Sequence, residues 1–170
     1  TDLVAGLAEV SDPADPASPT SCEVIAESVT ATRAHNELLV PTVTQLLQGA
    51  GRAFADLDAI VVGCGPGPFT GLRVGMATAS AFGQALGVPV HGVVTHDAVA
   101  AVLDAPSALV VTDARRREVY WARYDAGARV DGPDVVAPAA LECPPAAVCS
   151  VPEQLAEQLP ERLTAQAERV

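Results

Sequence analysis

The chain has 170 residues and a formal net charge of −11, and its ten basic residues are all arginine. A protein this acidic lacks the positive surface that it would need to bind nucleic acid on its own. No apolar run approaches the roughly 18 residues that span a membrane, so we expect no membrane contact. A chain of this length suits one domain or two small lobes.

Two strands are predicted first, over Leu3–Val10 and Cys22–Thr30, joined by the Pro/Asp/Ser-rich turn Ser11–Ser21. The segment Leu3–Leu7 has the pattern of the second strand of a hairpin. We therefore expect that native N-terminal residues, including a first strand, are missing from this numbering.

A helix is predicted next, over Ala34–Gln48, because apolar side chains recur there at helical spacing. Pro41 lies inside it, so either the first turn is separate or the axis bends. Strands and helices then alternate, which predicts a mixed α/β sheet with covering helices. The expected elements are strand Ala59–Gly63, helix Leu72–Leu86 ended by Gly87, strand Pro89–Val93, helix His96–Leu103, and strands Ala108–Asp113 and Glu118–Asp125. After Val130 the pattern weakens to a candidate strand at Ala146–Val151, a candidate helix at Pro152–Gln158 and a helix-permissive tail.

A glycine-rich loop lies between a predicted strand and a predicted helix, an arrangement that points backbone N–H groups at an anion. Its candidate residues are Gly63, Gly65, Pro66, Gly67, Thr70 and Gly71. A Walker phosphate loop is excluded because the chain has no lysine. A dinucleotide fingerprint is disfavoured because Pro68 occupies the position of its third glycine. The pattern favours a stiff strand-to-helix turn over a phosphate-binding loop, with Thr70 as the helix N-cap.

The helix after this loop is more apolar than a helix with one solvent-facing side should be. Its polar side chains are only Arg73, Thr78, Ser80 and Gln84. A ridge of small residues at Gly71, Gly75, Ala79 and Gly83 allows another backbone to approach closely. One face must meet the sheet, and we favour a second subunit on the other. The alternative is that the second lobe of the same chain covers it.

The sequence assigns no catalytic residue and no metal site. Its four cysteines lack the spacing of zinc ligands, so we expect reduced thiols and a cytoplasmic protein. Arg115, Arg116 and Arg117 form a predicted hairpin tip that either grips a phosphate or an acidic partner or is simply solvated. Asp113 is a candidate partner for one of these arginines. Asp97 is expected to interact with the dipole of its short helix.

Three blocks of sequence resemble the bacterial TsaB (YeaZ) family. Residues Val62–Gly75 resemble its G-P-G-S-F-T-G-L-R-I-G signature, with Pro68 in place of serine. Residues Thr112–Tyr120 resemble its D-A-R-x-x-E-V-Y block, and Arg33–Pro41 its H-S-E-x-L-L-P helix, with Asn36 in place of serine. The resemblance covers roughly residues 1–125 and leaves the last 45 residues with little that matches.

The resemblance implies an RNase H-like fold of the actin/Hsp70 type, with a mixed β-sheet, covering helices and two lobes, the second smaller or incomplete. We place these lobes at residues 1–101 and 102–170. The family acts in making threonylcarbamoyladenosine next to the tRNA anticodon. There TsaB is a non-catalytic partner of TsaD, which transfers the threonylcarbamoyl group, and of the ATPase TsaE. By this resemblance tRNA is bound only through the complex.

The resemblance also implies a surface for binding TsaD or a second copy of the chain. By position it contains His35, Leu38, Leu39 and Thr42 on one helix and Arg73, Met76, Ala77 and Ser80 on the other. We expect no cofactor on this chain, since ATP and Mg²⁺ are used by the partner subunits. The alternative is an ATPase or small-molecule kinase of the same superfamily that uses the loop Gly63–Gly71 for phosphate. The sequence does not distinguish a homodimer from a heterodimer.

Overall fold

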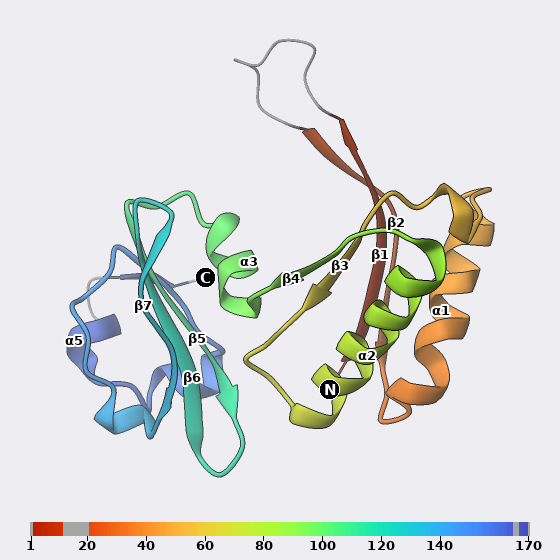
Figure 1. Cartoon of the computed structure of the whole chain (residues 1–170). Coiled ribbons are helices and arrows are strands. Elements are labelled where there is room, and N and C mark those ends of the chain that lie inside the picture. Colours follow the sequence, from red (N-terminus) through yellow and green to blue (C-terminus); the bar gives the residue numbers. More distant parts are fainter. Residues whose placement is uncertain (1, 12–20, 165–166, 170) are drawn as a thin grey trace. The chain divides into compact units, whose positions relative to one another are not determined.

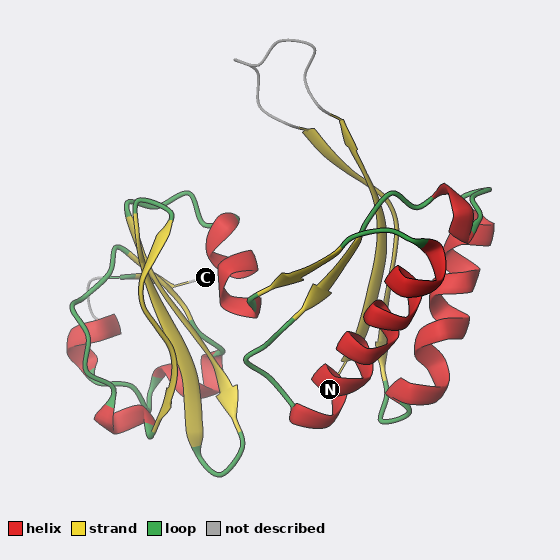
Figure 2. Ribbon diagram, in the orientation of Figure 1, coloured by secondary structure: helices red, strands yellow, loops and turns green. Residues whose placement is uncertain are grey.

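The computed structural model describes residues 2–11, 21–164 and 167–169, and the chain divides into two compact units (Figures 1 and 2). The first unit consists of residues up to Val62 together with Arg73–His91, and the second of Gly63–Leu72 together with Gly92 onward. The chain therefore passes between the units more than once, whereas the sequence predicts a single boundary after residue 101. The segment 92–101, which was assigned to the first lobe, belongs to the second unit because its helix contacts strands there.

The first unit begins with an antiparallel pair of strands, β1 (Asp2–Ser11) and β2 (Ser21–Ala31). Both strands were predicted and are confirmed, while residues 12–20 of the predicted turn lie outside the described residues. Helix α1 (His35–Gly49) lies against both strands and buries Leu47. The helix is continuous through Pro41, so its first turn is not separate.

A second pair of strands, β3 (Ile60–Gly63) and β4 (Val90–Val93), is connected by α2 (Phe69–Leu86). The N–H of Ile60 donates to the carbonyl of Pro89 at 2.9 Å, and the N–H of Cys64 to that of Val93 at 2.8 Å. The two bonds advance in the same direction along both strands, so the pair is parallel. A short 3₁₀ turn, η1 (Phe54–Asp56), leads into β3, and Phe54 meets Phe82 of α2 with ring centroids 5.1 Å apart.

From Gly75 to Gly83 the small-residue ridge of α2 faces these strands of its own chain, whereas a Cβ on Gly71 would meet nothing within 4 Å. A Cβ placed on Gly83 would overlap the Cγ2 of Val90 and come within 3.2 Å of the carbonyl oxygen of Val88. A Cβ on Gly75 would make an ordinary 3.7 Å contact with Val62, and Ala79 is buried. The backbone that the ridge admits is therefore that of the β3–β4 pair. This packing turns Arg73, Met76, Ala77 and Ser80 outward.

The second unit contains a five-stranded mixed sheet in the order β7-β6-β5-β8-β9. Antiparallel pairing joins β5 to β6 and β6 to β7, and parallel pairing joins β5 to β8 and β8 to β9. The strands are β5 (Ser107–Ala114), β6 (Glu118–Asp125), β7 (Ala128–Val136), β8 (Val148–Ser150) and β9 (Glu168–Arg169). The short helices are α3 (Thr95–Ala101), α4 (Glu153–Ala156), α5 (Glu161–Thr164) and the 3₁₀ turn η2 (Pro138–Ala140). The predicted mixed α/β architecture is confirmed.

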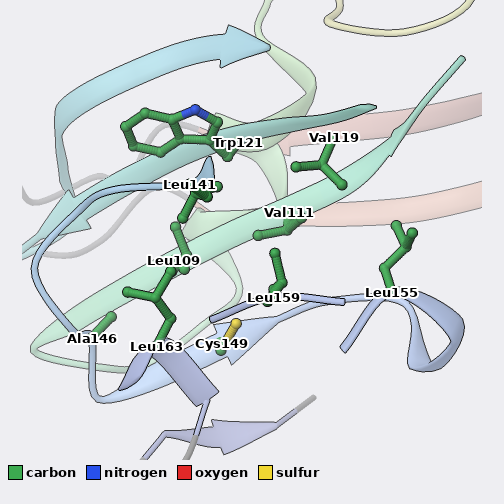
Figure 3. Close-up of a cluster of buried hydrophobic side chains, with 10 residues drawn as sticks. All are labelled: Leu109, Val111, Val119, Trp121, Leu141, Ala146, Cys149, Leu155, Leu159 and Leu163. Carbon is green, nitrogen blue, oxygen red and sulfur yellow. The ribbon is translucent and has the colours of Figure 1, made fainter. Parts of the chain in front are cut away.

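Alternation along β5 and β6 gives the sheet an apolar layer on each face. One layer, shown in Figure 3, joins Leu109 and Trp121 to residues from the C-terminal segments, including Leu141 and Leu163. The other joins Ala108, Val110, Ala122 and Tyr124 to Ala100 of α3. Trp121 and Tyr124 therefore lie on opposite faces of β6. Burying each leucine side chain contributes roughly 1.5–3 kcal/mol.

Candidate partner-binding surface

Five of the eight predicted interface residues are exposed in the structure. Leu38 on α1 and Met76 on α2 are 37% and 38% exposed, and Arg73, Ala77 and Ser80 are exposed as well. The other three, His35, Leu39 and Thr42, are half-buried on α1. We call the exposed residues of α1 and α2 the helical surface.

The helical surface is poor in charge. Arg73 is the single charged residue in the whole of α2, and the exposed positions that follow it along that helix are methionine, alanine, serine and glutamine. On α1, Val40 is 42% exposed beside Leu38. Isolated exposed apolar residues are ordinary on a protein surface, whereas depletion of charge around apolar residues is typical of an interface core. The composition of this surface suits contact with another polypeptide.

The glycine-rich loop is stiff and attached to α3. Gly65 has φ +91°, a Cβ on it would lie 2.8 Å from the Cδ1 of Leu72, and its carbonyl accepts the N–H of Thr95 at 2.7 Å. Glycine is therefore required at this position both for the backbone conformation and for the close approach. The prediction that Thr70 caps the helix is wrong, because α2 begins at Phe69, one residue earlier.

A shallow depression of about 350 Å³ lies beside this loop in the second unit. Its lining consists of Cys64, Gly65, Pro66, Val94, Tyr120, Pro133, Asp134 and Val135. Asp134 is its one ionisable carboxyl group, and none of these lining residues is basic. A site for a phosphorylated ligand needs positive charge or several N–H donors, so this lining gives the phosphate-binding alternative no support. Among the described residues no cluster of three or more potential ligands suits a metal ion, and no described helix is long and apolar enough to cross a membrane.

The hairpin tip between β5 and β6 presents three exposed arginines. Ala114 pairs with Glu118, so Arg115, Arg116 and Arg117 form a three-residue loop. Arg116 and Arg117 have φ values of +70° and +64°, which cost roughly 1 kcal/mol each relative to glycine. Asp113 is exposed, and within the described residues it forms no ion pair with any of these arginines. The predicted pairing of Asp113 with an arginine is therefore not observed.

A polar network with no signal in the local sequence connects α3 to the sheet: Tyr124 is buried, while the Asp97 and Arg129 side chains are 40% and 33% exposed. The Asp97 carboxylate accepts the Tyr124 hydroxyl at 2.7 Å and Arg129 Nη1 at 3.2 Å. The sequence predicts that Asp97 interacts with the dipole of its helix, and Asp97 does lie in the first turn of α3. Its carboxylate also binds two side chains 27 and 32 residues away. Burial, together with the hydrogen bond to Asp97, raises the pKa of Tyr124 well above its usual value.

His96, next to Asp97, is fully buried, and its Nε2 lies 2.8 Å from the hydroxyl of Thr112. Its Nδ1 has no hydrogen-bond partner in the described part of the chain. Burial lowers the pKa of His96, more than the nearby Asp97 raises it. A buried imidazole that favours its neutral form is a structural group rather than a phosphate ligand.

Comparison with known proteins identifies the family. Residues 23–165 match the model of the family described as TsaD: tRNA N6-adenosine threonylcarbamoyltransferase, and the chain belongs to this family. Within it, the chain is a TsaB (YeaZ)-type protein. Its fold matches that of YeaZ from Pseudomonas aeruginosa with a TM-score of 0.67 and 28% identity, over 81% of this chain and 70% of that chain. The RNase H-like, actin/Hsp70-type fold class is thereby confirmed.

Sequence relatives agree with this assignment. The chain is 35% identical over 96 residues to the tRNA threonylcarbamoyladenosine biosynthesis protein TsaB of Escherichia coli, covering 54% of this chain and 42% of the relative. It is 56% identical over 135 residues to an uncharacterized protein of Mycobacterium tuberculosis, covering 78% of this chain and 64% of the relative. The chain thus spans less than two thirds of the length of these relatives, and about a third of a Mycobacterium leprae relative.

Proposed function

We propose that this chain is an accessory subunit in the synthesis of threonylcarbamoyladenosine next to the tRNA anticodon, and that it activates TsaD by binding it. The E. coli relative is named for this biosynthesis, and the matched family model is named for the transferase itself. In this proposal the chain carries out no reaction of its own. ATP and Mg²⁺ act on the partner subunits TsaD and TsaE.

The observation that carries the proposal is the helical surface. Met76, Ala77 and Leu38 are exposed although they are apolar, and Arg73 is the one charge on α2. Because the ridge at Gly75 and Gly83 already meets the chain's own strands, we infer that the exposed side of α2 that contains Met76 and Ala77 meets another protein. Stable complexes bury about 800 Å² on each partner around an apolar centre, and in this proposal the exposed sides of α1 and α2 together supply that area.

Sedimentation velocity tests the proposal directly. The chain would be run alone and mixed with the TsaD-type protein of the same organism at concentrations between about 1 and 50 µM. A faster-sedimenting heterocomplex is expected. The proposal fails if the two proteins sediment independently throughout this range.

Nucleotide titration of the isolated chain separates the scaffold from the enzyme alternative. The proposal expects that ATP with Mg²⁺ binds the chain alone more weakly than about 10 µM, which corresponds to about 7 kcal/mol. Tighter binding would favour an ATPase or kinase that uses the Gly63–Gly71 loop. A homodimer that forms alone and gives way to the heterocomplex would be consistent with one shared surface, whereas a homodimer that persists beside TsaD would contradict it.

A further inference from the structure

The arginine tip, defined as Arg115, Arg116 and Arg117, differs in charge from the rest of the molecule. Segment 113–118 contains these three arginines with Asp113 and Glu118, so it carries +1, and the remainder of the chain carries −12. Three of the ten basic residues are thus consecutive at one exposed turn. A polyanion approaching this chain is repelled by most of the surface and attracted at this turn.

The guanidinium groups of the tip have no partner in the part of the chain that the structure describes. Other arginines of the described residues pair with carboxylates, as Arg52 does with Glu9 and Arg129 with Asp97. The tip arginines form no ion pair or hydrogen bond with the described residues. Their donors remain available for an external ligand, and a guanidinium matches phosphate oxygens with two parallel hydrogen bonds.

The backbone of the tip indicates that arginine is kept there at a cost to stability. Arg116 and Arg117 both adopt the left-handed region, with φ of +70° and +64°. Glycine or asparagine is the default residue at such positions, because their lack of a bulky Cβ substituent relieves the clash. Backbone outliers of this kind cluster at sites where the side chain has a functional task. Two successive arginines with positive φ at an exposed turn therefore point to a role for the side chains themselves.

We propose that the arginine tip binds the phosphate backbone of RNA, and that in the assembled complex it contributes to holding the tRNA. This inference rests on the proposed function, which makes a tRNA the substrate of the complex. The tip would supply positioning contacts without reading sequence, because phosphate contacts carry no base information. On the isolated chain, the charge of −12 elsewhere makes the same contact weak.

The test measures tRNA affinity of the complex formed with the TsaD-type partner, using a transcribed tRNA and fluorescence anisotropy at several salt concentrations. The variant R116G/R117G removes two positive charges and places glycine at the two positions with positive φ. We therefore expect higher stability and lower affinity for tRNA. Its thermal midpoint should rise by at least about 3 °C. Its affinity for tRNA should fall at least about fivefold, and the slope of log affinity against log salt should become shallower by about 1.4 to 1.8.

The matched control is Arg52→Gln, which removes a positive charge from another exposed position of the chain. Its tRNA affinity should stay within about twofold of the wild-type value. An unchanged affinity and salt slope in R116G/R117G would overturn the inference. An equal loss of tRNA affinity in R52Q would also overturn it, because the effect would then reflect net charge alone. The inference fails as well if R116G/R117G binds the TsaD-type partner more weakly while the assembled variant complex binds tRNA normally, because the tip would then contact an acidic protein surface. Failure of the proposed function is seen separately, because the wild-type complex would then not form.

Discussion

Replacing Gly83 with alanine tests which way α2 faces. Alanine at an interior helix position normally stabilises by up to about 1 kcal/mol relative to glycine. At Gly83, however, the new methyl group would overlap Val90 Cγ2 and approach the carbonyl of Val88 to 3.2 Å. Overpacking of this kind costs about 1–3 kcal/mol, and the stiff β-branched valine cannot turn away easily. The net expectation is a loss of about 1–2 kcal/mol.

Gly75→Ala is the matched control on the same ridge. Its methyl group would lie 3.7 Å from Val62, an ordinary contact, so the helix propensity should dominate and stabilise the chain by about 0.5–1 kcal/mol. Gly75→Arg is unsuitable as a test of partner binding, because the long side chain would disturb the packing of α2 on Val62 of its own chain. The double variant G83A/V90A should recover most of the loss, because the overlapping Cγ2 is gone.

Urea unfolding followed by circular dichroism measures these differences. The expected order of midpoint concentrations is G75A above wild type, wild type above G83A, and the double variant above the single G83A. Equal stabilisation by G75A and G83A would refute the packing described for α2. The ridge would then face solvent, and the assignment of Met76 and Ala77 to the exposed side of α2 would be wrong.

Two further predictions concern the second unit. Leu163→Ala should destabilise it by about 2–5 kcal/mol in denaturant unfolding, because Leu163 is 1% exposed. The control Val102→Ala should change stability by less than about 0.5 kcal/mol, because Val102 is 80% exposed. Equal effects of the two substitutions would contradict the core in Figure 3. The pKa of His96 in the folded chain lies below its unfolded value of 6.5. As the pH falls through 6.5, the unfolded chain therefore binds more protons than the folded chain does. The free energy of unfolding should accordingly fall from pH 7 to 5.5. His96→Gln should flatten this decline, and an equal slope in both proteins would show that His96 does not cause it.

Much of the fold was predictable because local pattern and tertiary structure agree from β1 to β6. The alternation in Val119–Tyr124, for example, matches the two apolar faces of β6. Strand β7 was missed because Gly132, Pro133 and two aspartates look like a turn. It is tolerated as the edge strand, where proline blocks no ladder bond that the sheet needs, and Gly132 is required because a Cβ there would lie 2.6 Å from the carbonyl of Trp121.

The candidate surface was predictable in part. The excess apolarity of α2 predicts an interface, and that stays a prediction. Which residues of α2 face outward follows from the packing of Gly83 on Val90. Helical periodicity could not distinguish them in a helix with so few polar residues. The Asp97–Tyr124–Arg129 network joins residues 27 and 32 positions apart and carries no local signal. Consecutive positive φ values at Arg116 and Arg117 are equally invisible, since the sequence there gives no glycine to mark the turn.

The central claim is that the helical surface binds the TsaD-type partner. Its most direct test is the dissociation constant of that partner for Met76→Glu, compared with Val102→Glu, which places the same charge on an exposed valine outside the surface. An unpaired carboxylate buried in an interface costs several kcal/mol, so M76E should weaken binding at least about 30-fold, while V102E should change it less than about threefold. Wild-type affinity in a folded M76E protein, or equal losses in both variants, would contradict the account.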